Sequence, residues 1–87
     1  MNAIQIVQAY DIRAESTAGH IHFQVIQPID KTFDDARKSA EKYIKFAKEA
    51  KLLSCSKTGS TQGATEDQKP DIEKNGCFIY KVHGCPE

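Results

Sequence analysis

The feature that most constrains the fold of this chain is one long segment with the period of an α-helix. From Phe33 to about Lys51, apolar residues recur at steps of three and four, while the lysines fall largely on other faces. Thr32 can cap this segment through its hydroxyl, and Asp34 and Asp35 follow where the helix dipole favours negative charge. The pattern predicts a helix over this range.

Two segments ahead of this helix alternate with the period of a β-strand. Residues 3–10 place Ile4, Ile6 and Tyr10 on one side of the first segment. After a polar stretch, residues 20–25 alternate polar with apolar side chains until Pro28 ends the pattern. The two segments are expected to pair as an antiparallel hairpin.

The region that follows the long helix changes from apolar to polar within a few residues. Leu52–Cys55 could form a short strand. Ser56–Ala64 contains serine, threonine, glycine, glutamine and lysine, which are too polar to bury and favour turns. This second stretch is expected to form a mobile loop.

The last part of the chain predicts a short helix and a final strand. Thr65–Gln68 has capping-box spacing and Asn75-Gly76 supplies a stop, although Pro70 removes an amide between them. Cys77–His83 then alternates with a period of two, as in a strand with one face on the core.

These elements predict a single α+β domain over residues 1–87. Its sheet is expected to be small and antiparallel, with three to four strands, and to carry one long and one short helix on one face. The 87 residues leave room for one hydrophobic core, and nine isoleucines against two leucines favour strands within it. The other sheet face would be open to solvent or to a partner.

Charge and composition exclude several classes of partner. Twelve basic and twelve acidic residues cancel, and the chain has two arginines, so the field that drives nucleic-acid binding is missing. The sequence contains neither an apparent export signal nor an apolar stretch long enough to span a membrane. Three cysteines are an odd number, which favours free thiols and a cytoplasmic location.

Histidines and cysteines are the candidate functional residues. His20 and His22 lie on one side of a predicted strand and could chelate zinc, although a polar strand surface explains the same residues and is the preferred interpretation, since no third ligand is fixed by spacing. Cys77 and His83 share one side of the last strand, and Cys55 and Cys85 lie near the ends of elements. Because no paired cysteine knuckle is present, the domain is expected to fold without metal or cofactor.

Short motifs along nearly the whole chain resemble an uncharacterised bacterial family, catalogued as domain of unknown function twenty twenty-four. They are Tyr10-Asp11, Gly19-His20, His22-Phe23, Asn75-Gly76, Phe78–Lys81 and Gly84-Cys85. The resemblance implies an α+β fold and no assigned activity. Gln24 stands in place of the family's aspartate and His83 in place of its last glutamate, so the chain resembles a divergent member.

The resemblance also implies a site built from cysteine, histidine and carboxylate. Of that set the chain keeps Asp11, His22, Cys55 and Cys85, and it lacks a second cysteine and the histidine beside it. Such a site would be partly degraded.

Two functions therefore stay open. The preferred one is a small non-enzymatic binding module that takes a protein partner, or a second copy, on its open sheet face or an edge strand. The alternative is a thiol- or metal-dependent activity at Asp11, His22, Cys55 and Cys85. Convergence of these four side chains on one point would favour the second.

Overall fold

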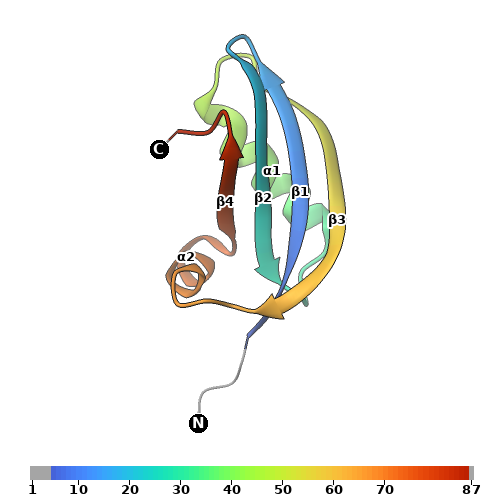
Figure 1. Cartoon of the computed structure of the whole chain (residues 1–87), viewed down its shortest axis with the longest axis vertical. Coiled ribbons are helices and arrows are strands. Elements are labelled where there is room, and N and C mark those ends of the chain that lie inside the picture. The colour runs from blue at the N-terminus through green and yellow to red at the C-terminus, as the bar shows by residue number, and fades with distance from the viewer. Residues whose placement is uncertain (1–4, 87) are drawn as a thin grey trace.

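The computed structural model describes residues 5–86, apart from the side chain of Ser60. Its elements, in chain order, are β1 (Ile6–Ser16), β2 (Gly19–Pro28), α1 (Phe33–Tyr43), the 3-10 turn η1 (Ile44–Phe46), β3 (Lys51–Gly63), α2 (Gln68–Asn75) and β4 (Phe78–His83) (Figure 1). The α+β class is confirmed. The expected first strand began at residue 3, and Ile4 lies outside the described residues.

The four strands form one antiparallel sheet in the order β3-β1-β2-β4. The predicted hairpin of β1 and β2 is confirmed, with a register that runs from Val7 opposite Pro28 to Ser16 opposite Gly19. β3 then pairs with the outer side of β1, and β4 with the outer side of β2. The two last strands of the chain therefore form the two edges of the sheet.

α1 begins at the residue that the sequence predicts. Thr32 Oγ1 accepts a hydrogen bond from the Asp35 amide at 3.2 Å, and the Asp35 carboxylate accepts one from the Thr32 amide at 3.0 Å. These bonds to Thr32 lower the pKa of Asp35. The helix ends earlier than Lys51, because the chain becomes extended at Ala47 and β3 already begins at Lys51.

Two hydrophobic clusters lie on opposite faces of the sheet. The larger one lies under α1 and contains Tyr10, Ile12, Ala14, Ile21, Phe23, Val25, Ala36, Ala40, Ile44 and Cys77. The smaller one joins Val7 and Ile26 to Ile72 of α2. Because Val25 and Ile26 are consecutive in a strand, their side chains point to opposite faces. The expectation that both helices pack on one face is therefore wrong: α1 lies behind the sheet in Figure 1, and α2 lies beside the start of β4.

The segment expected to be a mobile loop is part of a strand. Ser56–Gly63 belongs to the 13-residue strand β3, which pairs with β1 from Glu15 opposite Lys51 to Ile6 opposite Gly63. Thr58 Oγ1 also donates to the Ala9 carbonyl at 3.0 Å. An edge strand needs no apolar side chains, because its ladder hydrogen bonds hold it to the neighbouring strand.

The reciprocal bonds predicted between Thr65 and Gln68 are present in the turn that leads into α2, whose N-cap residue, Asp67, makes no side-chain capping bond. The Gln68 amide donates to Thr65 Oγ1 at 3.3 Å, and the Thr65 amide donates to Gln68 Oε1 at 3.1 Å. Pro70 lies in the first turn, where its missing amide would have had no partner within the helix. Gly76 ends the helix with a left-handed φ of 84°.

Candidate functional site

Asp11 and His22 form the closest polar side-chain pair among the candidate residues. His22 Nε2 lies 2.6 Å from Asp11 Oδ1, and both side chains are partly buried on the face opposite α1. Arg13 Nε approaches Asp11 Oδ2 at 3.5 Å, but the Arg13 side chain is mostly exposed. The carboxylate thus holds the His22 ring in one position, with the Arg13 guanidinium beside its other oxygen.

All three histidines of the chain line one shallow hollow on this face. His20, His22 and His83 surround it together with Arg13 and Leu53, and its volume is about 520 Å³. His22 and His83 are cross-strand partners on β2 and β4. Within residues 5–86, however, histidine, cysteine, aspartate and glutamate nowhere form a group of three or more that could hold a metal ion.

The cysteines lie on the other side of the sheet. Cys55 is opposite Ile12 of β1 and packs against the core under α1, whereas Asp11, one residue away, points to the opposite face. Burial raises the pKa of the Cys55 thiol, against the influence of Arg37. Burial likewise raises the pKa of Cys77. Neither thiol has the depressed pKa of a reactive cysteine.

Cys85 lies two residues after the end of β4, at one end of the sheet. Its thiol donates to the backbone carbonyls of His22, at 3.5 Å, and His83, at 3.6 Å. On its other side it lies next to Tyr43, and burial together with this neighbouring thiol raises the pKa of Tyr43 to about 12. Cys85 therefore holds the C-terminal segment against the sheet and the aromatic core.

The proposed set of Asp11, His22, Cys55 and Cys85 thus does not converge. Asp11 and His22 meet on one face, Cys55 lies on the other face of an edge strand, and Cys85 reaches only the backbone of His22. The sheet separates the Cys55 thiol from the Asp11–His22 pair, so these four side chains give no geometric basis for a shared metal or nucleophilic site.

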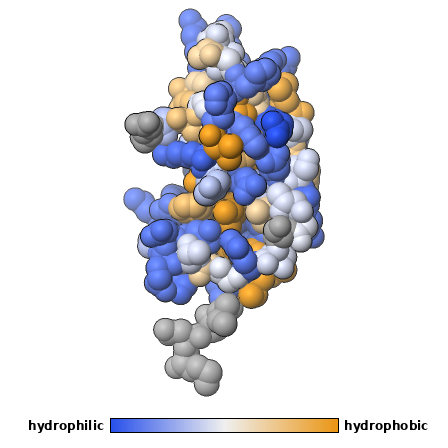
Figure 2. Space-filling view, in the orientation of Figure 1, coloured by the Kyte–Doolittle hydropathy of each residue, from blue (hydrophilic) through white to orange (hydrophobic). Residues whose placement is uncertain are grey.

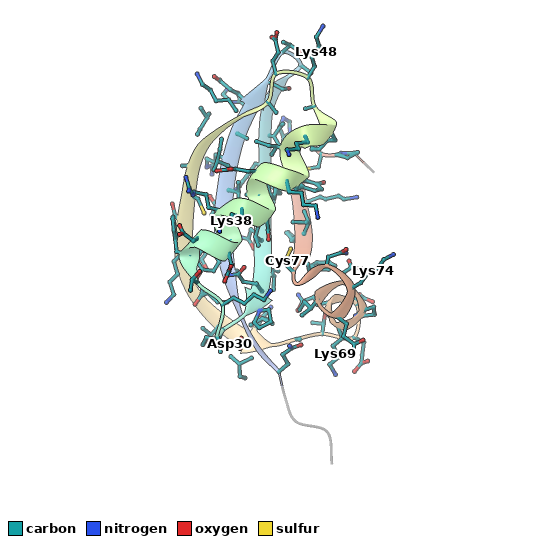
Figure 3. The ribbon with its side chains drawn as sticks, turned by 180° about the vertical axis from the view of Figure 1, so that it is seen from behind. Asp30, Lys38, Lys48, Lys69, Lys74 and Cys77 are labelled. Atoms are coloured by element: carbon teal, nitrogen blue, oxygen red, sulfur yellow. The ribbon has the colours of Figure 1, made fainter. Side chains whose placement is uncertain are left out.

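A cleft of about 480 Å³ lies on the α1 side of the sheet, beside β4. Its lining residues come from α1, η1, α2, β4 and the C-terminal segment; they are Ser39, Lys42, Tyr43, Phe46, Asp71, Asn75, Cys77, Ile79, Lys81 and Pro86. In Figure 3, which shows this side, Cys77 lies between α1 and α2. The cleft is thus assembled from parts of the chain that are distant in sequence.

A chain of aromatic contacts forms one wall of the cleft. The ring of Phe23, which is fully buried, meets that of Tyr43 edge-on at 4.8 Å, and Tyr43 meets Phe46 edge-on at 5.3 Å. Phe46 itself is 44% exposed. The wall therefore extends from the core to the surface and is fixed in place before any ligand arrives.

Positive charge predominates around this apolar wall. Lys42 and Lys81 line the cleft, and Asp71 is the acidic residue among its lining side chains. Lys31 and Lys42 lie close enough to Cys77 to lower its pKa, although burial outweighs them. The cleft thus combines apolar surface with an excess of ammonium groups.

Sequence reasoning found one residue of this cleft, Cys77, and missed the others as a site. Tyr43 is one of the apolar residues that recur along the predicted helix, and Lys42 is one of the lysines on its other faces. Phe46 could have indicated the cleft, because it is an aromatic residue near the end of the predicted helix that does not belong to the apolar stripe of that helix. The pairing of β4 with β2 brings Ile79 and Lys81 to the end of this helix. No local pattern in the sequence predicts that pairing.

No family model, no curated protein and no solved structure matches this chain. The resemblance to the family of unknown function stays a prediction. Among the described residues, no helix has the length and apolar character to cross a membrane.

Proposed function

We propose that this chain is a small binding module whose site is the cleft between α1, α2 and β4. Its ligand would have an apolar body and a negatively charged group. The observation that carries the proposal is the preformed aromatic wall of Tyr43 and Phe46 next to the ammonium groups of Lys42 and Lys81.

The dimensions and lining of the cleft support this choice. Ligand pockets in proteins usually have roughly 300–1,000 Å³ and a mainly apolar lining with a few polar groups. The cleft, at about 480 Å³, meets both conditions. In Figure 2, which shows the face opposite α1, apolar residues form separate patches among hydrophilic ones. The hollow on that face, of about 520 Å³, has the three histidines and Arg13 among its lining residues and contains no phenylalanine or tyrosine ring.

A thiol- or metal-dependent activity receives no such support. Cys77 lines the cleft, but burial raises its pKa, and the Asp11–His22 pair lies on the other side of the sheet. The cleft lining contains no histidine, and the carboxylate there, Asp71, raises the pKa of Cys77 further, so the thiol is not activated as a nucleophile.

Decanoate is a suitable probe, because it has one apolar chain and one carboxylate. Titration into isotopically labelled protein should shift the amide resonances of Lys42–Phe46 and Cys77–Lys81 in NMR spectra. Decyltrimethylammonium, with the same chain and the opposite charge, should bind at least about tenfold more weakly. Equal binding of both probes, or shifts spread over the whole surface, would exclude the proposed site.

Two phenylalanines on the same helical segment provide matched variants. Phe46→Ala removes the exposed end of the aromatic wall and should weaken decanoate binding about tenfold. Phe33→Ala removes a ring of similar exposure at the other end of α1, 47% against 44%, and should leave binding unchanged. If both variants bind as the original protein does, the ligand lies elsewhere.

A further inference from the structure

We infer that the ligand of this cleft is an extended acidic peptide that adds to the sheet as a strand along β4. This inference rests on the proposed function and specifies its ligand class. In such recognition, main-chain hydrogen bonds to an edge strand give affinity, and pockets for alternate side chains give specificity.

β4 has a free edge that fits this role. It is the last strand in the order β3-β1-β2-β4, and residues 5–86 place no strand on its outer side. Two of its three apolar residues outside the cleft face, Tyr80 and Val82, are about half exposed, at 55% and 49%. A strand edge with exposed apolar side chains favours pairing with another chain.

Lysines and register shifts occur at both edges of the sheet. β3 carries Lys51 and Lys57, and its pairing with β1 contains two register shifts; the shorter β4 carries Lys81, and its pairing with β2 contains one, between His22 and Phe23. These features discourage edge-to-edge pairing, and they do not separate the two edges. What favours β4 is the cleft beside it, whose lining includes Ile79 and Lys81 of that strand.

The cleft lies where alternate side chains of an added strand would arrive. Ile79 and Lys81 share one parity of β4 and line the cleft together with Cys77, which directly precedes the strand, whereas Tyr80 has the other parity. A strand beside β4, at a spacing of about 4.8 Å, would direct every second side chain over the cleft. An apolar residue would then lie next to Ile79, against the ring of Phe46.

Charge selects an acidic peptide over other occupants. A residue of the added strand opposite Lys81 would also approach Lys42 across the cleft, so a carboxylate there would gain attraction from both ammonium groups. A second copy of this chain, paired through its own β4, would instead bring another Lys81 toward the same edge. Like charges at that position disfavour self-association.

The test uses an acetylated, amidated peptide in which threonines alternate with glutamate, leucine and valine. All three of these side chains lie on one face of the extended peptide. Binding to the full chain is measured by calorimetry and by NMR, where the amides of Phe78–His83 should shift and gain protection from hydrogen exchange. A peptide with lysine in place of glutamate should bind about tenfold more weakly.

Main-chain pairing is tested by N-methylation of alternate peptide amides. One set of amides in an added strand points to β4 and the other points to solvent. Methylation of one set should weaken binding at least tenfold, and methylation of the other should have little effect. If both sets tolerate methylation while decanoate still binds in the cleft, the strand-addition inference is wrong and the proposed function stands.

Charge exchange provides the matched protein variants. Lys81→Glu should weaken binding of the glutamate peptide about tenfold and strengthen that of the lysine peptide. Lys57→Glu makes the same change on the opposite edge strand and should alter neither. A concentration-dependent dimer in sedimentation, with protection confined to β4, would assign the edge to a second copy and overturn the inference.

Discussion

His22 Nε2 and Asp11 Oδ1 lie 2.6 Å apart on neighbouring strands, on the face of the sheet that α1 does not cover. The pair is partly buried, with 23% of the histidine side chain and 28% of the aspartate side chain exposed. A hydrogen bond of this length in such a position stabilises the β1–β2 pairing whether or not the face binds a ligand.

Asp11→Asn should reduce the free energy of unfolding by about 1 kcal/mol, because a charge-assisted hydrogen bond is replaced by a weaker one. Urea denaturation at neutral pH measures the change. Arg13→Gln is the matched control, since its guanidinium is 60% exposed and 3.5 Å from the same carboxylate. It should cost less than about 0.5 kcal/mol. Equal losses would show that Asp11 acts mainly through Arg13.

Tyr43 should make stability depend on alkaline pH. Its hydroxyl is buried and has no well-formed hydrogen bond among residues 5–86, and burial next to Cys85 raises its pKa from 10.0 to about 12. The folded state thus holds the phenolic proton more tightly than the unfolded state does. The associated stability is present below pH 10 and is lost as the pH rises through 12.

Tyr43→Phe isolates this effect. At pH 7 the variant should unfold within about 1 kcal/mol of the original protein, because the lost hydroxyl made no strong bond. Between pH 10 and 12 the original protein should lose more stability than the variant does. Thermal unfolding at several pH values measures both. Parallel curves for the two proteins would show that Tyr43 ionises equally in both states.

All three thiols should stay free, and they should react at different rates. Cys55 lies on β3 and Cys85 follows β4, so three strand spacings, roughly 14 Å, separate the two edges. A disulfide requires Cα atoms within about 7 Å. Brief alkylation of the native protein, followed by mass spectrometry, should modify Cys77 last, because it is buried while the other two are partly exposed. An intramolecular Cys55–Cys85 bridge would contradict the sheet order.

The fold was predictable wherever its cause is local. The cap of α1 at Thr32 and the reciprocal bonds between Thr65 and Gln68 ahead of α2 each join residues three positions apart, and the structure contains both. β3 was missed beyond Cys55 because its polar residues are held by main-chain bonds to β1, which side-chain composition does not reveal. The placement of α2 was missed because Ile72 packs with Val7 and Ile26, residues far away in sequence.

The candidate site was less predictable than the fold. Strand parity alone places His20 and His22 on one face, and both line the same hollow. The cleft requires the end of α1, the second half of α2 and β4 to meet, which is a property of the tertiary structure. Tyr43 and Lys81 are 38 positions apart and have no shared pattern in the sequence.

Gly84 is expected to be the glycine that least tolerates a side chain. Its φ is 73°, and a Cβ atom there would lie 2.3 Å from the backbone oxygen of His20. Gly59 has a similar φ of 81°, but a Cβ there would meet nothing within 4 Å. Gly59→Ala should therefore cost about 1 kcal/mol, which is the conformational penalty alone.

Gly84→Ala should cost at least about 1 kcal/mol more than Gly59→Ala, unless the C-terminal segment moves away from His20. Such movement would break the contact of the Cys85 thiol with the His22 carbonyl and expose that thiol. Denaturation and alkylation together distinguish the two cases: either the midpoint falls, or Cys85 reacts faster at an unchanged midpoint. If Gly84→Ala matches Gly59→Ala in both measurements, the close approach of Gly84 to His20 is not maintained in solution.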